Sequence, residues 1–183
     1  MRQPQFSWGK PDGVTFTPLT THPDSRGDLT ELFRLEWQLG QPPVQWNLVH
    51  SRPDVLRGVH VHPIHEDYLI VIQGRMLLGL CDIRQDSPTW GARWLIELTG
   101  QQLQGVFIPH GVAHGFYFPE PATLLYSVSH YWDIRDELGC RWDDPVLNLP
   151  WPAQNPSLSA RDATASSFEQ MCLDYTAACH AAV

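Results

Sequence analysis

Histidine is concentrated in the middle of this sequence, where seven of its nine histidines lie between His50 and His130. His60 and His62 are two positions apart, and side chains at that spacing in a β-strand point to the same face. Two imidazoles on an inward face are costly unless they are paired, protonated for chemistry or bound to a metal. The spacing therefore indicates acid–base chemistry or a metal, although one or two of these histidines could instead be surface or hydrogen-bonded core residues.

Residues 14–131 must supply the strands that position these histidines. Short β-type runs alternate there with Gly, Pro and Asp, a pattern typical of a double-sheet jelly roll. We expect about ten strands, including one over residues 30–37 and a β-hairpin whose tight turn contains Gln73 and Gly74. His65 and His110 lie next to turns, so both are expected to face solvent.

The rest of the chain, residues 141–183, is predicted to begin as an irregular, proline-containing segment and to end as a helix after Ser166. Four apolar residues of that helix recur at the spacing of one helix face, namely Phe168, Met171, Cys172 and Tyr175. No repeat or linker divides the chain. The sequence therefore predicts one all-β jelly-roll domain over residues 1–183, with a short C-terminal helix.

The charge balance excludes several classes of partner. Twelve Lys and Arg against twenty Asp and Glu give a net charge of −8, so nucleic acid is not an expected ligand.

No apolar run approaches the length of about 20 residues that spans a bilayer, and the N-terminus lacks the apolar region of a secretory signal. With four cysteines and no CxxC pair, we expect a reduced, cytoplasmic protein.

Two segments resemble the paired motifs of the cupin superfamily of jelly rolls. The first contains His60, His62, Asp67 and Gly74, and the second is residues 109–114 (PHGVAH). The resemblance implies a possible metal site of His60, His62, Asp67 and His114, with Glu66 as the alternative carboxylate. Three imidazoles and one carboxylate suit Zn, Fe, Ni, Mn or Cu. A metal-bound His60 could not also act as a base through the same nitrogen.

A narrower resemblance extends over residues 14–165. The ordered matches include residues 24–27 (DSRG), 55–60 (VLRGVH), 109–116 (PHGVAHGF) and 137–145 (ELGCRWDDP). They are similar to the dTDP-4-dehydrorhamnose 3,5-epimerase family. Its members are homodimeric jelly-roll enzymes that require no cofactor and invert C3 and C5 of a 4-keto-6-deoxyhexose attached to dTDP. The resemblance implies a homodimer that binds a small-molecule nucleotide sugar.

The same resemblance implies roles for single residues. His60 would be the base that removes a proton next to the ketone, and Asp162 the carboxylate that orients His60. The substrate would be held by Arg26, Glu31, Gln45, Asn47, Arg57, His114, Trp132 and Glu137.

Two positions depart from the family pattern. Counting back from Gly74, the lysine that supports the enolate falls on Asp67. A carboxylate about 4 Å from an enolate repels it by about 4 kcal/mol at an effective dielectric constant near 20. Counting back from Glu137, the catalytic tyrosine falls on Trp132, whose indole N–H lacks useful acidity.

Three functions follow from these observations. The leading hypothesis is an epimerase that acts on a 4-keto-6-deoxyhexose nucleotide at one or both carbons. The second is a metal-dependent cupin enzyme, in which Asp67 binds the ion as a ligand instead of repelling the enolate. The third is a protein that binds a nucleotide sugar without turnover, which would retain Arg26 and Arg57 and lack the acid at Trp132.

Overall fold

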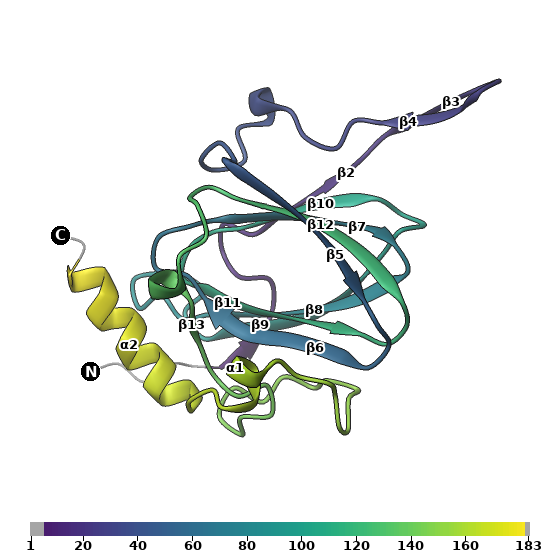
Figure 1. The fold of residues 1–183 in the computed structure, drawn as a ribbon. Coiled ribbons are helices and arrows are strands. Elements are labelled where there is room, and N and C mark those ends of the chain that lie inside the picture. The colour runs from purple at the N-terminus through teal and green to yellow at the C-terminus, as the bar shows by residue number, and fades with distance from the viewer. Residues whose placement is uncertain (1–5, 182–183) are drawn as a thin grey trace.

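Two β-sheets packed face to face form the body of the protein (Figure 1). The structure is a computed structural model and describes residues 6–181. Its architecture confirms the predicted all-β jelly roll with one short C-terminal helix. Within residues 6–181, none of the helices has both the length and the apolar composition needed to cross a bilayer.

The strands are distributed over a six-stranded sheet and a five-stranded sheet. In spatial order, the six-stranded sheet contains β1 (Ser7–Trp8), β9 (Ala92–Thr99), β8 (Arg75–Asp82), β11 (Val112–Phe118), β6 (Val55–Val61) and β13 (Leu138–Gly139). The five-stranded sheet contains β2 (Thr15–Pro18), β10 (Gln104–Ile108), β7 (Asp67–Gln73), β12 (Ala122–Val128) and β5 (Gln45–Ser51). Apart from β1, which runs parallel to β9, neighbouring strands are antiparallel.

The chain changes sheets between β7 and β8. Gly74 has a φ of +75°, which favours glycine, so the predicted tight turn is present. The predicted β-hairpin is wrong, because β7 and β8 belong to different sheets and do not pair. The turn therefore carries the chain from one layer of the sandwich to the other.

The segment between β2 and β5 stands outside the sandwich. It contains a two-stranded hairpin, β3 (Thr21–Asp24) and β4 (Gly27–Thr30), that projects away from the two sheets in Figure 1. The strand predicted over residues 30–37 is wrong, because β4 ends at Thr30 and the chain continues as a loop that leads into the 3₁₀-helix η1 (Leu35–Trp37). The side chains of Leu32 and Phe33 pack on Tyr68 and Phe107 of the five-stranded sheet, and this segment pairs with none of its strands.

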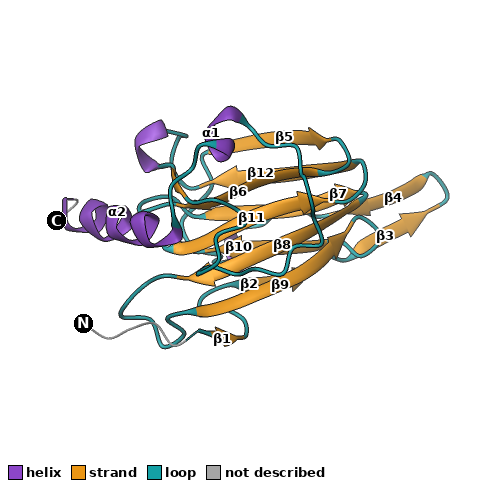
Figure 2. Cartoon of the chain, turned by 90° about the horizontal axis from the view of Figure 1, so that it is seen from below, coloured by secondary structure: helices purple, strands orange, loops and turns teal. Residues whose placement is uncertain are grey.

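Residues after β12 run alongside the six-stranded sheet, and those from Cys140 to Tyr175 pack on one of its faces. They include the 3₁₀-helix η2 (Ile134–Asp136), the short helix α1 (Ala160–Ala163) and the C-terminal helix α2 (Phe168–Ala181). Figure 2 shows α2 at one end of the sandwich. Phe168, Met171 and Tyr175 of α2 are buried, which confirms the predicted apolar face.

Candidate active site

A cavity of about 660 Å³ lies between the two sheets. Strand alternation explains its lining, because every second residue of a strand faces the interior. The five-stranded sheet contributes Asn47, Val49, Asp67, Leu124, Tyr126 and Val128. The six-stranded sheet contributes Val55, Leu56, Arg57, His60, His114 and Phe116, and His62 follows β6 directly. The cavity thus has two walls of different chemistry.

A β-bulge brings Arg57 and His60 to the same cavity. These residues are three positions apart, so regular alternation would place them on opposite faces of β6. On the neighbouring strand β11, however, their partners are Phe116 and His114, which are only two positions apart. The extra residue in β6 changes the alternation, and both side chains therefore face inward.

The half-buried His60 and the buried Asp162 form a pair. Nε2 of His60 lies 2.7 Å from Oδ1 of Asp162, which belongs to α1. The hydroxyl of Ser159 caps α1 by accepting a hydrogen bond from the Asp162 backbone N–H. Although burial acts to raise the pKa of Asp162, the hydrogen bond from His60 and its neighbours holds that pKa below its usual value. Because an ionised carboxylate only accepts, His60 carries a hydrogen on Nε2, and the lone pair of its Nδ1 lies 3.3 Å from Nη2 of Arg161.

Arg161 covers this pair and was missed in the sequence analysis. Its Nη2 lies 2.8 Å from Nε2 of His60, and its Nη1 donates to Oε2 of Glu137 at 2.6 Å. A signal was available, since Arg161 directly precedes the predicted Asp162. Arg161 and Arg57 place two guanidinium groups in the cavity lining.

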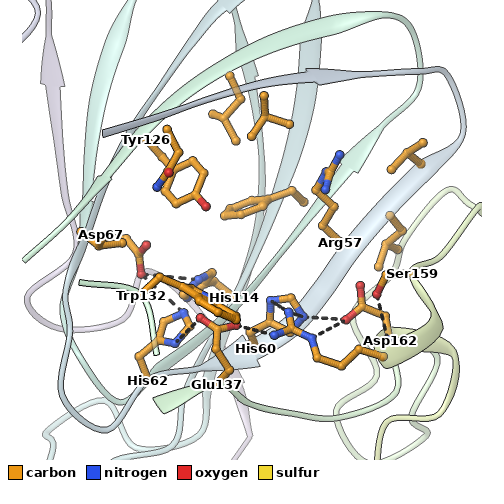
Figure 3. Close-up of a pocket in the computed structure, with 18 of the residues that line it drawn as sticks. Arg57, His60, His62, Asp67, His114, Tyr126, Trp132, Glu137, Ser159 and Asp162 are labelled. Carbon is orange, nitrogen blue, oxygen red and sulfur yellow. Dashed lines mark hydrogen bonds and ion pairs between the residues drawn. The ribbon is translucent and has the colours of Figure 1, made fainter. Parts of the chain in front are cut away.

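A second buried cluster occupies the same cavity next to the His60–Asp162 pair (Figure 3). His62, Asp67 and His114 bring one ligand atom each within 4.8 Å of one another. Burial lowers the pKa of His62 well below its usual value and that of His114 to about 3, so both rings are neutral. Burial also raises the pKa of Asp67 to about 7. His60 is not a member of this group, so the structure separates it from the other three predicted metal ligands. The alternative carboxylate, Glu66, instead accepts a hydrogen bond from the backbone N–H of Gln41.

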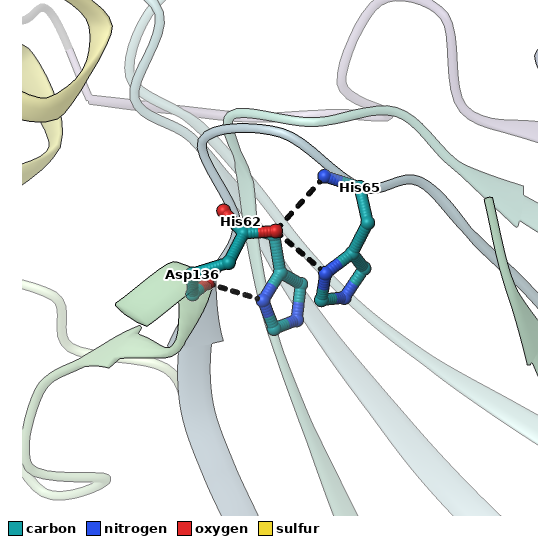
Figure 4. Close-up of side chains that lie close together, drawn as sticks. All are labelled: His62, His65 and Asp136. Carbon is teal, nitrogen blue, oxygen red and sulfur yellow. Dashed lines mark hydrogen bonds and ion pairs between the residues drawn. The ribbon is translucent and has the colours of Figure 1, made fainter. Parts of the chain in front are cut away.

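His65 adjoins the cluster, contrary to the expectation that it faces solvent. It is buried, and its ring stacks on His62 with centroids 3.7 Å apart (Figure 4). Nδ1 of His65 lies 2.7 Å from Oδ2 of Asp136, and the same carboxylate accepts hydrogen bonds from the backbone N–H groups of Ile64 and His65. The turn after His62 is therefore folded onto η2, whereas His110 is exposed as expected.

Tyr126 is a second functional candidate that the sequence analysis missed. It lies on β12, on the wall opposite β6, and its hydroxyl points into the cavity in Figure 3. Burial raises the pKa of its phenol, which is therefore protonated at neutral pH. Trp132, where the family resemblance places the tyrosine, also lines the cavity but is 52% exposed. A signal was available, because Tyr126 lies two positions from both Leu124 and Val128 and therefore shares their face of the strand.

The other predicted substrate-binding residues divide into two groups. Asn47 and Glu137 line the cavity, and Gln45 is tied to its rim because it donates to Asn47 and accepts from the backbone N–H of Trp132. The structure does not bring Arg26 and Glu31 to the cavity. Arg26 lies in the turn of the projecting β3–β4 hairpin and pairs with Asp24, and Glu31 pairs with Arg34.

Comparison with known proteins identifies the same family along most of the chain. Residues 10–170 match the family described as dTDP-4-dehydrorhamnose 3,5-epimerase. The enzyme of that name from Shigella flexneri is 33% identical over 168 residues, which cover 86% of this chain and 92% of the relative.

Two solved structures share the fold. The dTDP-6-deoxy-D-glucose-3,5-epimerase of Legionella pneumophila, in complex with dTDP-4-keto-L-rhamnose, is similar with a TM-score of 0.80 and 29% identity over 91% of this chain and 94% of that one. ChmJ, a 3'-monoepimerase from Streptomyces bikiniensis, is similar with a TM-score of 0.81 and 25% identity over 92% of this chain and 88% of that one. The latter is a double mutant with one histidine and one tyrosine replaced, in complex with dTDP. From the match over residues 10–170 and the shared fold, we conclude that the chain belongs to the dTDP-4-dehydrorhamnose 3,5-epimerase family.

Proposed function

We propose that this protein is a sugar-nucleotide epimerase that acts on a 4-keto-6-deoxyhexose carried on dTDP. The observation that carries the proposal is the placement of a base and an acid on opposite walls of one cavity. The His60–Asp162 pair lies on the side of the six-stranded sheet, and the Tyr126 phenol lies on the five-stranded sheet. A sugar ring between them has one group on each face.

The reaction requires one proton to leave and another to arrive. Once Arg161 has turned from His60 to the phosphate of the substrate, Nδ1 of His60 takes the proton from the carbon next to the ketone. The electron pair of that C–H bond passes to the ketone oxygen as an enolate. The hydroxyl of Tyr126 then gives its proton to the opposite face of the same carbon. Asp162 stabilises the imidazolium that forms on His60. Exchange with water afterwards returns both side chains to their starting states.

The cations of the cavity lining suit the diphosphate of the substrate. Arg57 and Arg161 each offer a planar fork of N–H donors that can bind a phosphate through two parallel hydrogen bonds. Asn47 and the indole of Trp132 lie in the same lining. We assign them to the nucleoside, because an amide pairs with a base edge and an exposed aromatic ring stacks on it.

Deuterium exchange tests this function directly. The wild-type protein and the His60→Asn variant are incubated in D₂O with dTDP-4-keto-6-deoxyglucose, and NMR follows the ring hydrogens. We expect deuterium next to the ketone with wild type and exchange at least about 100-fold slower in the variant. The number of deuterated positions gives the number of carbons that react. Binding of the nucleotide sugar by wild type without exchange would overturn the proposal and favour a binding protein.

We also propose that the protein works as a homodimer. Val44, Trp46 and Leu48 leave apolar surface exposed at and just before β5, which is the edge strand of the five-stranded sheet. The projecting β3–β4 hairpin holds Arg26 away from its own cavity. A second copy of the chain would cover this apolar edge. Arg26 of one copy would then lie at the cavity of the other copy.

Subunit mixing tests this arrangement. Arg26→Ala and His60→Asn are expected to be weakly active or inactive alone, and light scattering should give twice the mass of the chain. When the two variants are unfolded and refolded together, mixed dimers contain one site with both residues intact, so activity should return. A monomeric wild-type protein, or mixtures that stay inactive, would contradict the shared site.

A further inference from the structure

Three imidazole groups surround one buried carboxylate oxygen next to the His60–Asp162 pair. Oδ2 of Asp67 lies 3.7 Å from Nε2 of His62, 3.6 Å from Nε2 of His114 and 3.8 Å from Nε2 of His65. These separations exceed hydrogen-bond distance. No donor among residues 6–181 comes within hydrogen-bond distance of the Asp67 carboxylate, although its side chain is only 7% exposed. A buried carboxylate is costly unless positive charge offsets it, and His65, whose pKa Asp136 and Asp67 raise against the effect of burial, supplies that charge only at 3.8 Å.

The other ring nitrogens show which way the lone pairs point. Nδ1 of His62 lies 3.0 Å from the backbone carbonyl oxygen of Asp136, and Nδ1 of His114 lies 3.0 Å from that of Val112. A carbonyl oxygen only accepts, so both rings carry their hydrogen on Nδ1. Each Nε2 therefore presents a lone pair towards an oxygen that presents lone pairs of its own. Histidines that bind metals are held in this way by an acceptor at the second nitrogen.

We infer that His62, Asp67 and His114 bind one divalent transition-metal ion, with its remaining coordination position open to the cavity. Two neutral imidazoles and one carboxylate are a ligand set for Zn²⁺, Fe²⁺, Co²⁺ or Ni²⁺. Two atoms that are each about 2.1 Å from a tetrahedral ion lie roughly 3.4 Å apart. The observed separations of 3.6 and 3.7 Å from Asp67 need to close by only a few tenths of an ångström.

His60 and His65 are not part of the proposed ligand set. Nε2 of His60 is already bonded to Asp162. His65 stacks on His62 with 26° between the ring planes, so an ion in the plane of the His62 ring lies well outside the plane of His65. The metal and the base therefore do not compete for His60, and both can be present in one cavity.

The charge of the occupied site suggests its role, which rests on the proposed function. A divalent ion with one carboxylate and two neutral imidazoles carries a net charge of +1. This equals the charge of the lysine that the family resemblance places at Asp67. Because the cluster lines the same cavity as His60, the ion would stabilise the enolate oxygen that the Asp67 carboxylate alone would repel.

A Co²⁺ titration tests the site without any substrate. The full-length protein is stripped with a chelator and titrated with Co²⁺, whose visible absorption is strong when it has four or five ligands. We expect one Co²⁺ per chain in wild type and at least about a tenfold weaker affinity in Asp67→Asn and His62→Gln. His60→Asn should bind Co²⁺ as wild type does, and so should the matched control His110→Gln.

Each outcome decides the inference. It is overturned if stripped wild type takes up no Co²⁺ or Zn²⁺, if Asp67→Asn binds as tightly as wild type, or if His60→Asn loses the ion. Near-ultraviolet circular dichroism checks that each variant is folded, and the wild-type titration decides the matter if a variant does not fold. A protein that epimerises but binds no metal refutes only this inference. A protein that binds the metal but never exchanges deuterium refutes only the proposed function.

Discussion

Nε2 of His60 lies 2.7 Å from Oδ1 of Asp162, although the two residues are 102 positions apart in the chain. His60 belongs to the six-stranded sheet, whereas Asp162 belongs to a short helix that docks against β6 after the sandwich is complete. The neighbouring Arg161 reaches the same imidazole. One turn of helix therefore delivers both the carboxylate that orients the base and a cation for the substrate.

Replacing Asp162 by Asn should remove the orienting charge and keep the shape. We expect kcat to fall by about 10²–10⁴-fold, because an amide can hold His60 in the wrong tautomer and cannot stabilise its imidazolium. Steady-state assays with the 4-keto sugar nucleotide measure this. The exposed Asp174→Asn change in α2 is the control, and a kcat near that of wild type in Asp162→Asn would show that the carboxylate has no role in the reaction.

Replacing Tyr126 by Phe should separate proton removal from inversion. Without the phenol, the enolate can still regain a proton from His60 on the face where it was lost. We therefore expect deuterium exchange to continue while formation of the epimer slows by about 100-fold. NMR in D₂O reports both events in one experiment. Trp132→Phe is the comparison variant, and normal inversion in Tyr126→Phe together with lost inversion in Trp132→Phe would assign the acid to the tryptophan position.

Arg161, which lines the cavity, should contribute more to nucleotide binding than an arginine outside the cavity does. Lys in its place keeps the positive charge but loses the planar fork, so Arg161→Lys should weaken dTDP binding by about tenfold. Isothermal titration calorimetry with dTDP measures the change. Arg141, which is exposed and paired with Asp143, provides the matched control Arg141→Lys. Equal dTDP affinities in the two variants would exclude a role for Arg161 in binding the nucleotide.

Asp82 should stabilise the fold in a pH-dependent manner. Burial acts to raise its pKa, but hydrogen bonds from Arg84, Ser87 and Thr89 reverse this and hold the pKa below its usual value. A carboxylate with a lowered folded-state pKa stabilises the fold above its unfolded pKa of about 3.9. That stability is lost as the pH falls through the folded-state pKa. We expect Asp82→Asn to cost about 1–3 kcal/mol at pH 7.

Urea unfolding at several pH values measures this contribution. The difference between wild type and Asp82→Asn should be constant from about pH 7 to pH 5 and should shrink below about pH 4. Asp86→Asn, in the same loop, is the control. A difference that is the same at pH 3 and pH 7 would show that the effect of Asp82 is not one of charge.

The strands β2 and β5 to β12 were predictable because each has its own pattern of apolar residues, whereas the short strands β1, β3, β4 and β13 have none. The exceptions are instructive. Residues 30–37 have the composition of a strand, yet Leu32 and Phe33 pack on the outer face of an existing sheet. Local composition does not distinguish a segment that packs on a sheet from one that joins it. The turn at Gly74 was predictable from the glycine, whereas the change of sheet depends on how the whole chain is layered.

The site was predictable only in part from the residues themselves. The spacing of His60 and His62 indicated that both side chains share one face of a strand. The inward position of both Arg57 and His60 depends on a β-bulge, which residue types alone do not predict. The pairing of His60 with Asp162 came from the family resemblance, since no local spacing connects them. The burial of His65 depends on Asp136, which approaches from a distant loop.

The position of α1 places two groups of the site near the end of the chain, the carboxylate that orients His60 and the guanidinium of Arg161. Asn47, Arg57, Asp67, His114 and Tyr126 have all been synthesised by residue 128, whereas His60 receives its carboxylate only when residue 162 is made. A chain that lacks α1 has neither the carboxylate that orients His60 nor the Arg161 guanidinium at the cavity. Catalytic competence in this protein is therefore acquired late, when the last fifth of the chain docks against the sandwich.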